Sequence, residues 1–173
     1  PEARKLLIEH EDQGAVVRWI SLAQLTMSDE EAMGSSVHSF VEEPESAPAT
    51  FVGAHPLLSD GVRPDSEGYR LFDPLHERCT PVEPSGSARR HAQWFLTMDA
   101  DEALAAISTS RAWARVLPSS DSDGAARLAG MVLLGVGEPR PGDVPVAAEL
   151  LGGLCRQDPD SVPEWGEEPV GLL

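Results

Sequence analysis

The sequence predicts an α+β protein, with a small antiparallel sheet in its N-terminal half and short packed helices in its C-terminal half. Two observations predict this division. Short runs rich in β-branched and aromatic residues occupy the first half of the chain, and apolar residues recur at helical spacing in the second. We therefore expect one globular domain over residues 1–157, β-rich in 1–86 and helical in 87–157, followed by an acidic tail over 158–173.

The first two apolar runs predict a β-hairpin. Residues 6–8 and 15–20 are rich in leucine, isoleucine and valine, and segment 11–14 between them ends in a glycine that can take the left-handed turn position. Two later runs, 49–53 and 69–72, predict further strands, with turn-forming residues at 59–61 and 65–68 between them. Together these strands would form the small antiparallel sheet.

Capping residues and apolar spacing predict the helices. Ser28 and Glu31 form a capping box that starts a short helix through Met33. Further helices are predicted in the C-terminal half: two helices or one kinked helix from Ser87 through Ile107 with a capping box at 99–102, then helices over 110–117, 125–136 and from Asp143 to Leu154. Segment 121–124 is expected to be a linker and a helix cap.

Negative charge is the most distinctive property of the chain. There are 29 acidic and 13 basic residues, a formal charge of -16. Residues 1–60 carry 11 acids and 3 bases and residues 119–173 carry 10 and 3, whereas the middle third, 61–118, is nearly neutral with 8 and 7. This charge repels nucleic-acid phosphates and anionic membranes, so we expect neither as a direct partner, and it favours a basic protein surface. Self-repulsion favours a monomer or a weak homodimer.

Composition also indicates a cytoplasmic location for the protein. No apolar stretch approaches the ~20 residues of a membrane helix, and residues 1–5 lack the apolar region of a signal peptide. The two cysteines, Cys79 and Cys155, are far apart in the sequence and fit free thiols in a reducing cytoplasm, with one disulfide between them as the alternative. The single lysine beside 12 arginines is typical of a GC-rich genome, bacterial or viral.

One cluster in the middle segment carries chemistry-bearing side chains. Asp73, His76 and Cys79 recur at three-residue spacing and could present oxygen, nitrogen and sulfur to a metal. Zinc needs a fourth ligand, and His91 is the only nearby candidate, so we expect no metal and no cofactor. The catalytic alternative is a Cys79 nucleophile activated by His76 or His91.

Two further features suggest binding residues. Arg89 and Arg90 lie at the start of a predicted helix, where the helix dipole disfavours cations; such a placement indicates a carboxylate contact, most simply with the protein's own acidic segments. Trp165 lies outside any apolar stripe and is either an anchor for a partner or a cover for a groove on its own domain. The other tryptophans are expected in the core: Trp19, Trp94 and Trp113.

The sequence thus predicts a non-enzymatic acidic interaction protein that binds a basic protein partner. Adaptors, bacterial immunity proteins, secretion chaperones and DNA-mimicking inhibitors share this size and charge, an analogy of composition alone. The chain lacks a glycine-rich phosphate loop, a nucleophile elbow and paired metalloprotease histidines. The alternatives are an enzyme of unfamiliar type with a Cys/His site in the middle segment, and a structural subunit of a larger assembly.

Overall fold

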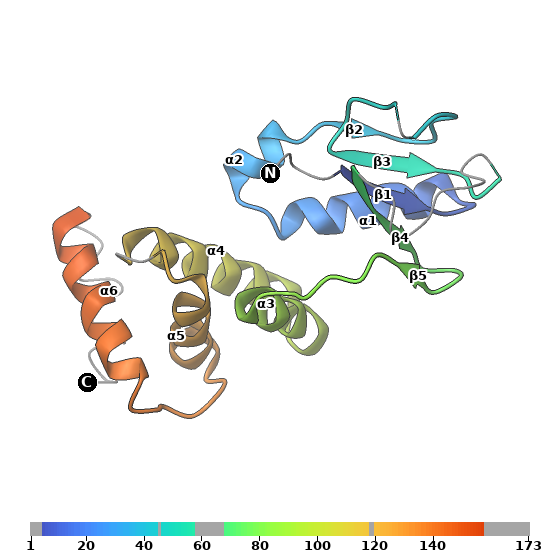
Figure 1. The fold of residues 1–173 in the computed structure, drawn as a ribbon. Coiled ribbons are helices and arrows are strands. Elements are labelled where there is room, and N and C mark those ends of the chain that lie inside the picture. Colours follow the sequence, from blue (N-terminus) through green and yellow to red (C-terminus); the bar gives the residue numbers. More distant parts are fainter. Residues whose placement is uncertain (1–4, 45, 58–67, 118–119, 158–173) are drawn as a thin grey trace. The chain divides into compact units, whose positions relative to one another are not determined.

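The computed structural model describes residues 5–44, 46–57, 68–117 and 120–157, which fall into two compact units that divide between Glu83 and Pro84. The first unit contains the sheet and the second contains only helices in its described residues (Figure 1). The predicted α+β class, with a sheet first and packed helices after it, is confirmed. The predicted turns at 59–61 and 65–68 and the tail over 158–173, with Trp165, lie outside the described residues.

The sheet of the first unit has five strands in the order β2-β3-β1-β4-β5. Their bounds are β1 Lys5–Glu9, β2 Val37–His38, β3 Phe51–Ala54, β4 Tyr69–Asp73 and β5 Arg78–Cys79. The central strand β1 runs parallel to β3 and β4, β2 runs parallel to β3, and β5 alone is antiparallel to its neighbour β4. The sheet is therefore mixed, whereas the sequence predicted antiparallel pairing throughout.

The predicted hairpin is wrong, because its second strand is a helix. Residues 15–20 belong to α1, which spans Gln13–Leu25, and the Asp12 carboxylate accepts the Gly14 N–H as its N-cap. Burial of Val16 and Ile20, one helical turn apart, outweighs the strand propensity of the valine and isoleucine run. A helix after β1 carries the chain back across the sheet, which is why the next central strands run parallel to β1.

Helix α1 packs closely on one face of the sheet. Val16 and Ile20 form a core with Ile8 and Phe51, and the approach requires glycine in β3. A Cβ on Gly53 would lie 2.4 Å from Val16 Cγ1, closer than packed carbons can come. The short helix α2, Asp29–Gly34, follows with the predicted Ser28 and Glu31 capping box.

The opposite face of the sheet packs under the loop that precedes β3. Leu7, Val52 and Leu71 form its core with two alanines of the loop, Ala47 and Ala49. Successive side chains of a strand point to opposite faces of the sheet, so that Leu7 and Glu9 lie on one face and Leu6 and Ile8 on the other. Polar side chains can therefore contact one another only if they lie on the same face.

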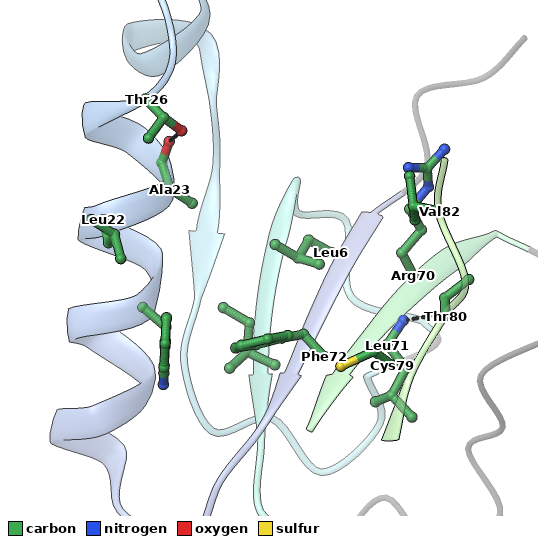
Figure 2. A pocket seen from close by; sticks show the side chains of 12 residues that line it. Leu6, Leu22, Ala23, Thr26, Arg70, Leu71, Phe72, Cys79, Thr80 and Val82 are labelled. Carbon is green, nitrogen blue, oxygen red and sulfur yellow. Dashed lines mark hydrogen bonds between the residues drawn. The ribbon is translucent and has the colours of Figure 1, made fainter. Parts of the chain in front are cut away.

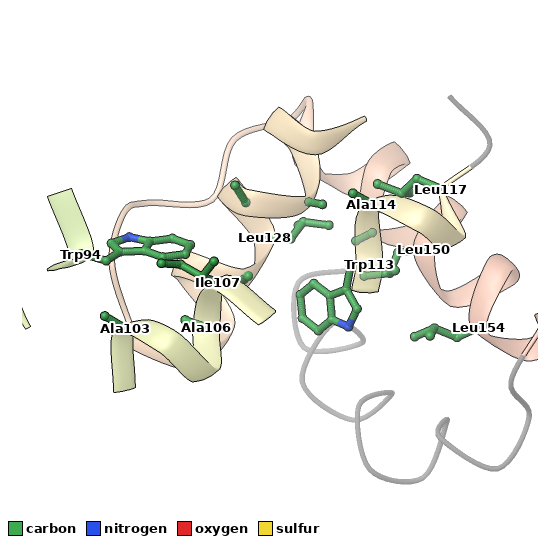
Figure 3. Packing of buried hydrophobic residues seen from close by; sticks show 14 residues of the cluster. Trp94, Ala103, Ala106, Ile107, Trp113, Ala114, Leu117, Leu128, Leu150 and Leu154 are labelled. Carbon is green, nitrogen blue, oxygen red and sulfur yellow. The ribbon is translucent and has the colours of Figure 1, made fainter. Parts of the chain in front are cut away.

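The described residues of the second unit form four helices around one core, whose buried side chains are drawn in Figure 3. Their bounds are α3 Gly86–Thr97, α4 Ala100–Val116, α5 Ser122–Leu134 and α6 Asp143–Gln157. Trp94 and Trp113 are buried in this core, as predicted. The predicted break before residue 110 is absent, because α4 continues to Val116. Helices α4 and α6 meet at Gly153, where an added Cβ would lie 2.7 Å from the Val116 carbonyl oxygen.

A buried ion pair joins α5 to α6. The Asp143 carboxylate accepts hydrogen bonds from Arg127 Nε at 2.5 Å and Nη2 at 2.7 Å, and from the Arg140 backbone N–H at 2.7 Å. Aspartate is a favoured N-cap residue, and the sequence predicts that Asp143 caps this helix; in the structure Asp143 is instead the first residue of α6. The first cause of its lowered pKa is the hydrogen bond from Arg127.

Candidate functional site

Two buried carboxylates lie at the carboxyl ends of neighbouring parallel strands. Glu9 ends β1 and Asp73 ends β4, and their exposed fractions are 1% and 0%. The carboxyl ends of parallel strands are where ligands bind in open α/β sheets, so this cluster is a candidate site. Asp73 is among the candidate residues predicted from the sequence, whereas Glu9 is not.

One guanidinium bonds to both carboxylates. Arg78, from β5, donates from Nη2 to Glu9 and from Nε to Asp73 Oδ2 at 2.7 Å. His76 adds its backbone N–H, 3.1 Å from Asp73 Oδ1, and its ring Nδ1, 2.9 Å from Oδ2. Burial raises the pKa of Asp73, but the hydrogen bonds from Arg78 and His76 outweigh burial and lower it.

This cluster is satisfied by the protein's own side chains. Arg78 supplies the positive charge that two buried carboxylates require. Within the described residues no group of three or more His, Cys, Asp or Glu side chains is placed to hold a metal ion. The arrangement is that of an electrostatic support for the sheet end, because the guanidinium of Arg78 bonds to both Glu9 and Asp73.

The structure separates the members of the predicted Cys/His site. His76 bonds to Asp73 on the face of the sheet that carries Leu71, whereas Cys79 pairs with Phe72 and lines a pocket on the α1 face. His91 belongs to the second unit. Cys79 and Cys155 are both free and exposed. None of the twelve residues lining the pocket is a histidine, so the pocket offers no base to activate the Cys79 thiol.

The pocket that Cys79 lines belongs to the first unit. It has a volume of about 420 Å³ and lies between α1 and the β4–β5 side of the sheet. Figure 2 shows Leu22, Ala23 and Thr26 projecting from α1 on one side, with Phe72 and Cys79 from β4 and β5 on the other. The remaining lining residues are Leu6, Ile8, Trp19, Arg70, Leu71, Thr80 and Val82.

Aromatic and aliphatic side chains dominate this pocket, and several reach solvent. Trp19 is 37% exposed, so its predicted place in the core is wrong; its ring stands edge-on to Phe72 at a centroid distance of 4.9 Å. Leu22 and Val82 are 40% and 47% exposed. Helical geometry explains the error, because Trp19 lies beside the Val16 and Ile20 stripe of α1 rather than within it. An apolar pocket with an accessible rim is a binding feature that the sequence analysis missed.

A carboxylate of the second unit lies at the start of α3, the helix in which the sequence places Arg89 and Arg90. The Asp123 carboxylate accepts the Ser87 backbone N–H at the N-terminus of α3. That hydrogen bond is the first cause of the lowered pKa of Asp123, and the charge of Arg90 contributes. Asp121, two residues before, caps α5 by accepting the N–H groups of Asp123 and Gly124, as predicted for this segment. The protein's own acid therefore fills the helix N-terminus beside Arg90.

His91 is held neutral inside the second unit. Its Nε2 lies 3.2 Å from the hydroxyl oxygen of buried Ser110, and its ring lies 5.2 Å from that of Trp94. Burial, with the charges of Arg111 and Arg90, lowers the pKa of His91 to about 4. A group with this pKa stays unprotonated near neutral pH and is a poor general base.

This burial of His91 predicts a loss of stability in mild acid. Because the folded pKa lies below the unfolded value of about 6.5, the unfolded chain binds the proton first, and stability falls as the pH drops from about 6.5 to 4. His91→Gln should flatten that slope by less than about 1.4 kcal/mol per pH unit, since partial exposure screens the effect. Denaturant unfolding at a series of pH values measures the slope. The control is His38→Gln, at an exposed position of β2, which should leave it unchanged.

None of the described helices is long and apolar enough to cross a membrane. Comparison with known proteins gives no family to which the chain can be assigned: no family model, no curated protein and no solved structure matches it.

Proposed function

We propose that the protein is a non-enzymatic acidic interaction protein that binds a basic protein partner. The observation that carries this proposal is the uneven division of charge between the two units. Residues 1–83 contain 16 acidic and six basic residues, a formal charge of -10, whereas residues 84–173 contain 13 and seven, a formal charge of -6. Within the second unit, residues 84–157 are nearly balanced, with eight acidic and seven basic residues, and residues 158–173 contain the other five acids. The first unit therefore carries the larger share of the negative charge.

Two basic residues of the first unit are paired with its own carboxylates. Arg78 is committed to buried Glu9 and Asp73, and Arg18 pairs with Asp12. Several carboxylates of the same unit are exposed: Glu11, Asp29, Glu30, Glu42 and Glu43. An outward surplus of one sign speeds the encounter with an oppositely charged surface and selects against partners of like charge.

The test uses the salt dependence of association. Partners captured from the native host at low salt should be basic, and their association rate should fall several-fold between about 50 and 200 mM salt. Asp29→Asn with Glu30→Gln removes two exposed charges from α2 and should slow association further. The matched control, Glu138→Gln with Glu149→Gln, removes two exposed charges from the second unit and should slow it less. Capture of neutral partners alone, with no salt effect on the association rate, would sink the proposal.

A further inference from the structure

The geometry points to the α1 pocket as the anchor site of this partner: we propose that it receives the apolar side chains of a basic, amphipathic helical segment. This inference rests on the proposed function and adds to it where the partner is held. The pocket is formed by Leu6, Ile8, Trp19, Leu22, Phe72 and Val82, together with the thiol of Cys79. Its volume of about 420 Å³ is at the small end of the range for ligand pockets and suits one or two large side chains.

The rim of the pocket has the character of an interface centre. Trp19, Leu22 and Val82 are each between 37% and 47% exposed, so their apolar surfaces reach solvent together at one opening. Tryptophan at the edge of a well-formed pocket is a frequent hot spot in protein interfaces, and apolar anchors that fill such pockets supply most of the affinity. A partner side chain entering here would remove this apolar surface from water.

Charge around the opening selects the sign of the partner. Arg70 is the one charged residue among the pocket-lining residues. The segments that line the pocket run directly into acidic ones: α1 is followed by Asp29 and Glu30 at the start of α2, and Val82 is followed by Glu83. Lysine and arginine flanking an apolar anchor would be attracted by these carboxylates, which outnumber the single positive charge of Arg70, whereas an acidic segment would be repelled by them.

The form of the segment follows from the neighbouring strand edge. β5 is two residues long and is followed by Pro81, which has no N–H to donate to an added strand. Extension of the sheet by a partner strand is therefore disfavoured at this edge. A helix that inserts side chains at one-turn spacing needs no backbone hydrogen bonds from the pocket.

The probe is a synthetic peptide of about 18 residues with leucine on one helical face and lysine on the other. A second peptide replaces every leucine by glutamine and keeps the charge. We expect the leucine peptide to bind the full chain at least about tenfold more tightly than the glutamine peptide. In the same complex, alkylation of Cys79 should slow several-fold, while alkylation of Cys155, in the second unit, should keep its rate and serves as an internal reference.

Matched variants test the pocket itself. Leu22→Gln should weaken binding of the leucine peptide about tenfold. The control is Leu25→Gln, which should change the affinity less than about twofold, because Leu25 is 53% exposed on the same helix and does not line the pocket. Val82→Gln gives a second pocket variant outside any helix, should Leu22→Gln fail to fold.

The outcomes separate this inference from the proposed function. The pocket assignment would be overturned if both lysine peptides bound equally and in a salt-dependent way, or if Leu22→Gln and Leu25→Gln had equal effects. Either result would leave the proposed function, binding of a basic partner by the acidic surface, standing. If neither peptide binds, the pocket assignment fails, whereas the proposed function fails only if the captured partners are neutral and salt has no effect on their association rate. A homodimer that Leu22→Gln converts to monomer in sedimentation would also overturn the assignment, since a second copy would then be the occupant.

Discussion

Arg78→Met should destabilise the first unit by about 3–5 kcal/mol, because it leaves Glu9 and Asp73 buried without a counter-charge. The measurement is denaturant unfolding of the full chain followed by circular dichroism. The control is Arg18→Met, which removes an exposed pair with Asp12 and should cost less than about 1 kcal/mol.

The pH dependence of the same variant should reverse in sign. In the native protein the pKa of Asp73 is lowered, so its contribution to stability is complete above about pH 4 and is lost as the pH falls through the folded pKa. Without Arg78, burial, which is the largest single influence on Asp73, raises the pKa of that carboxyl above its unfolded value. Stability of Arg78→Met should therefore rise as the pH falls. A further Glu9→Gln substitution should recover part of the loss; similar losses for Arg78→Met and Arg18→Met would show that the buried pairing is unimportant.

Asp143→Ala should destabilise the second unit by a comparable amount, about 3–5 kcal/mol. It leaves the guanidinium of Arg127, whose side chain is 18% exposed, without its carboxylate, and it frees the Arg140 N–H. Glu149→Ala, at an exposed position of the same helix, is the control and should change stability by less than about 0.5 kcal/mol.

Two further measurements identify the cause of the Asp143→Ala effect. The double variant Arg127→Met with Asp143→Ala should be more stable than Asp143→Ala alone, because no buried charge is left unpaired. Since the hydrogen bond from Arg127 lowers the pKa of Asp143, the native protein should lose this contribution as the pH falls below about 4 and Asp143→Ala should not. If the changes in the free energy of unfolding caused by Arg127→Met and Asp143→Ala were additive, the ion pair would not be the source of this stability.

The sequence predicted helices best where capping residues and apolar spacing agree. Ser28 with Glu31, and Asp99 before α4, mark the starts that the structure has. The prediction failed for α1, where valine and isoleucine favour a strand but Val16 and Ile20 pack as a helical stripe on the sheet. Asp12 as N-cap, with apolar residues at one-turn intervals after it, was the signal that could have corrected this.

The same error hid the candidate site. Reading residues 15–20 as a strand puts Trp19 in a sheet core, whereas a helix places it at the opening of a pocket with Leu22. Glu9 and Arg78 were missed for a different reason. Glu9 and Arg78 are 69 residues apart in the sequence, and they are in contact only because β1, β4 and β5 are neighbours in the sheet. No local sequence pattern predicts such a long-range contact.

Both outer strands of the sheet, β2 and β5, are only two residues long. Short outer strands present few unpaired backbone groups, and the proline after β5 removes one more donor. Chains of this protein therefore have little template for the edge-to-edge pairing that leads to aggregation, and their shared negative charge adds repulsion between copies. Edge-to-edge joining of sheets is therefore disfavoured, although the first unit leaves an apolar pocket open to solvent.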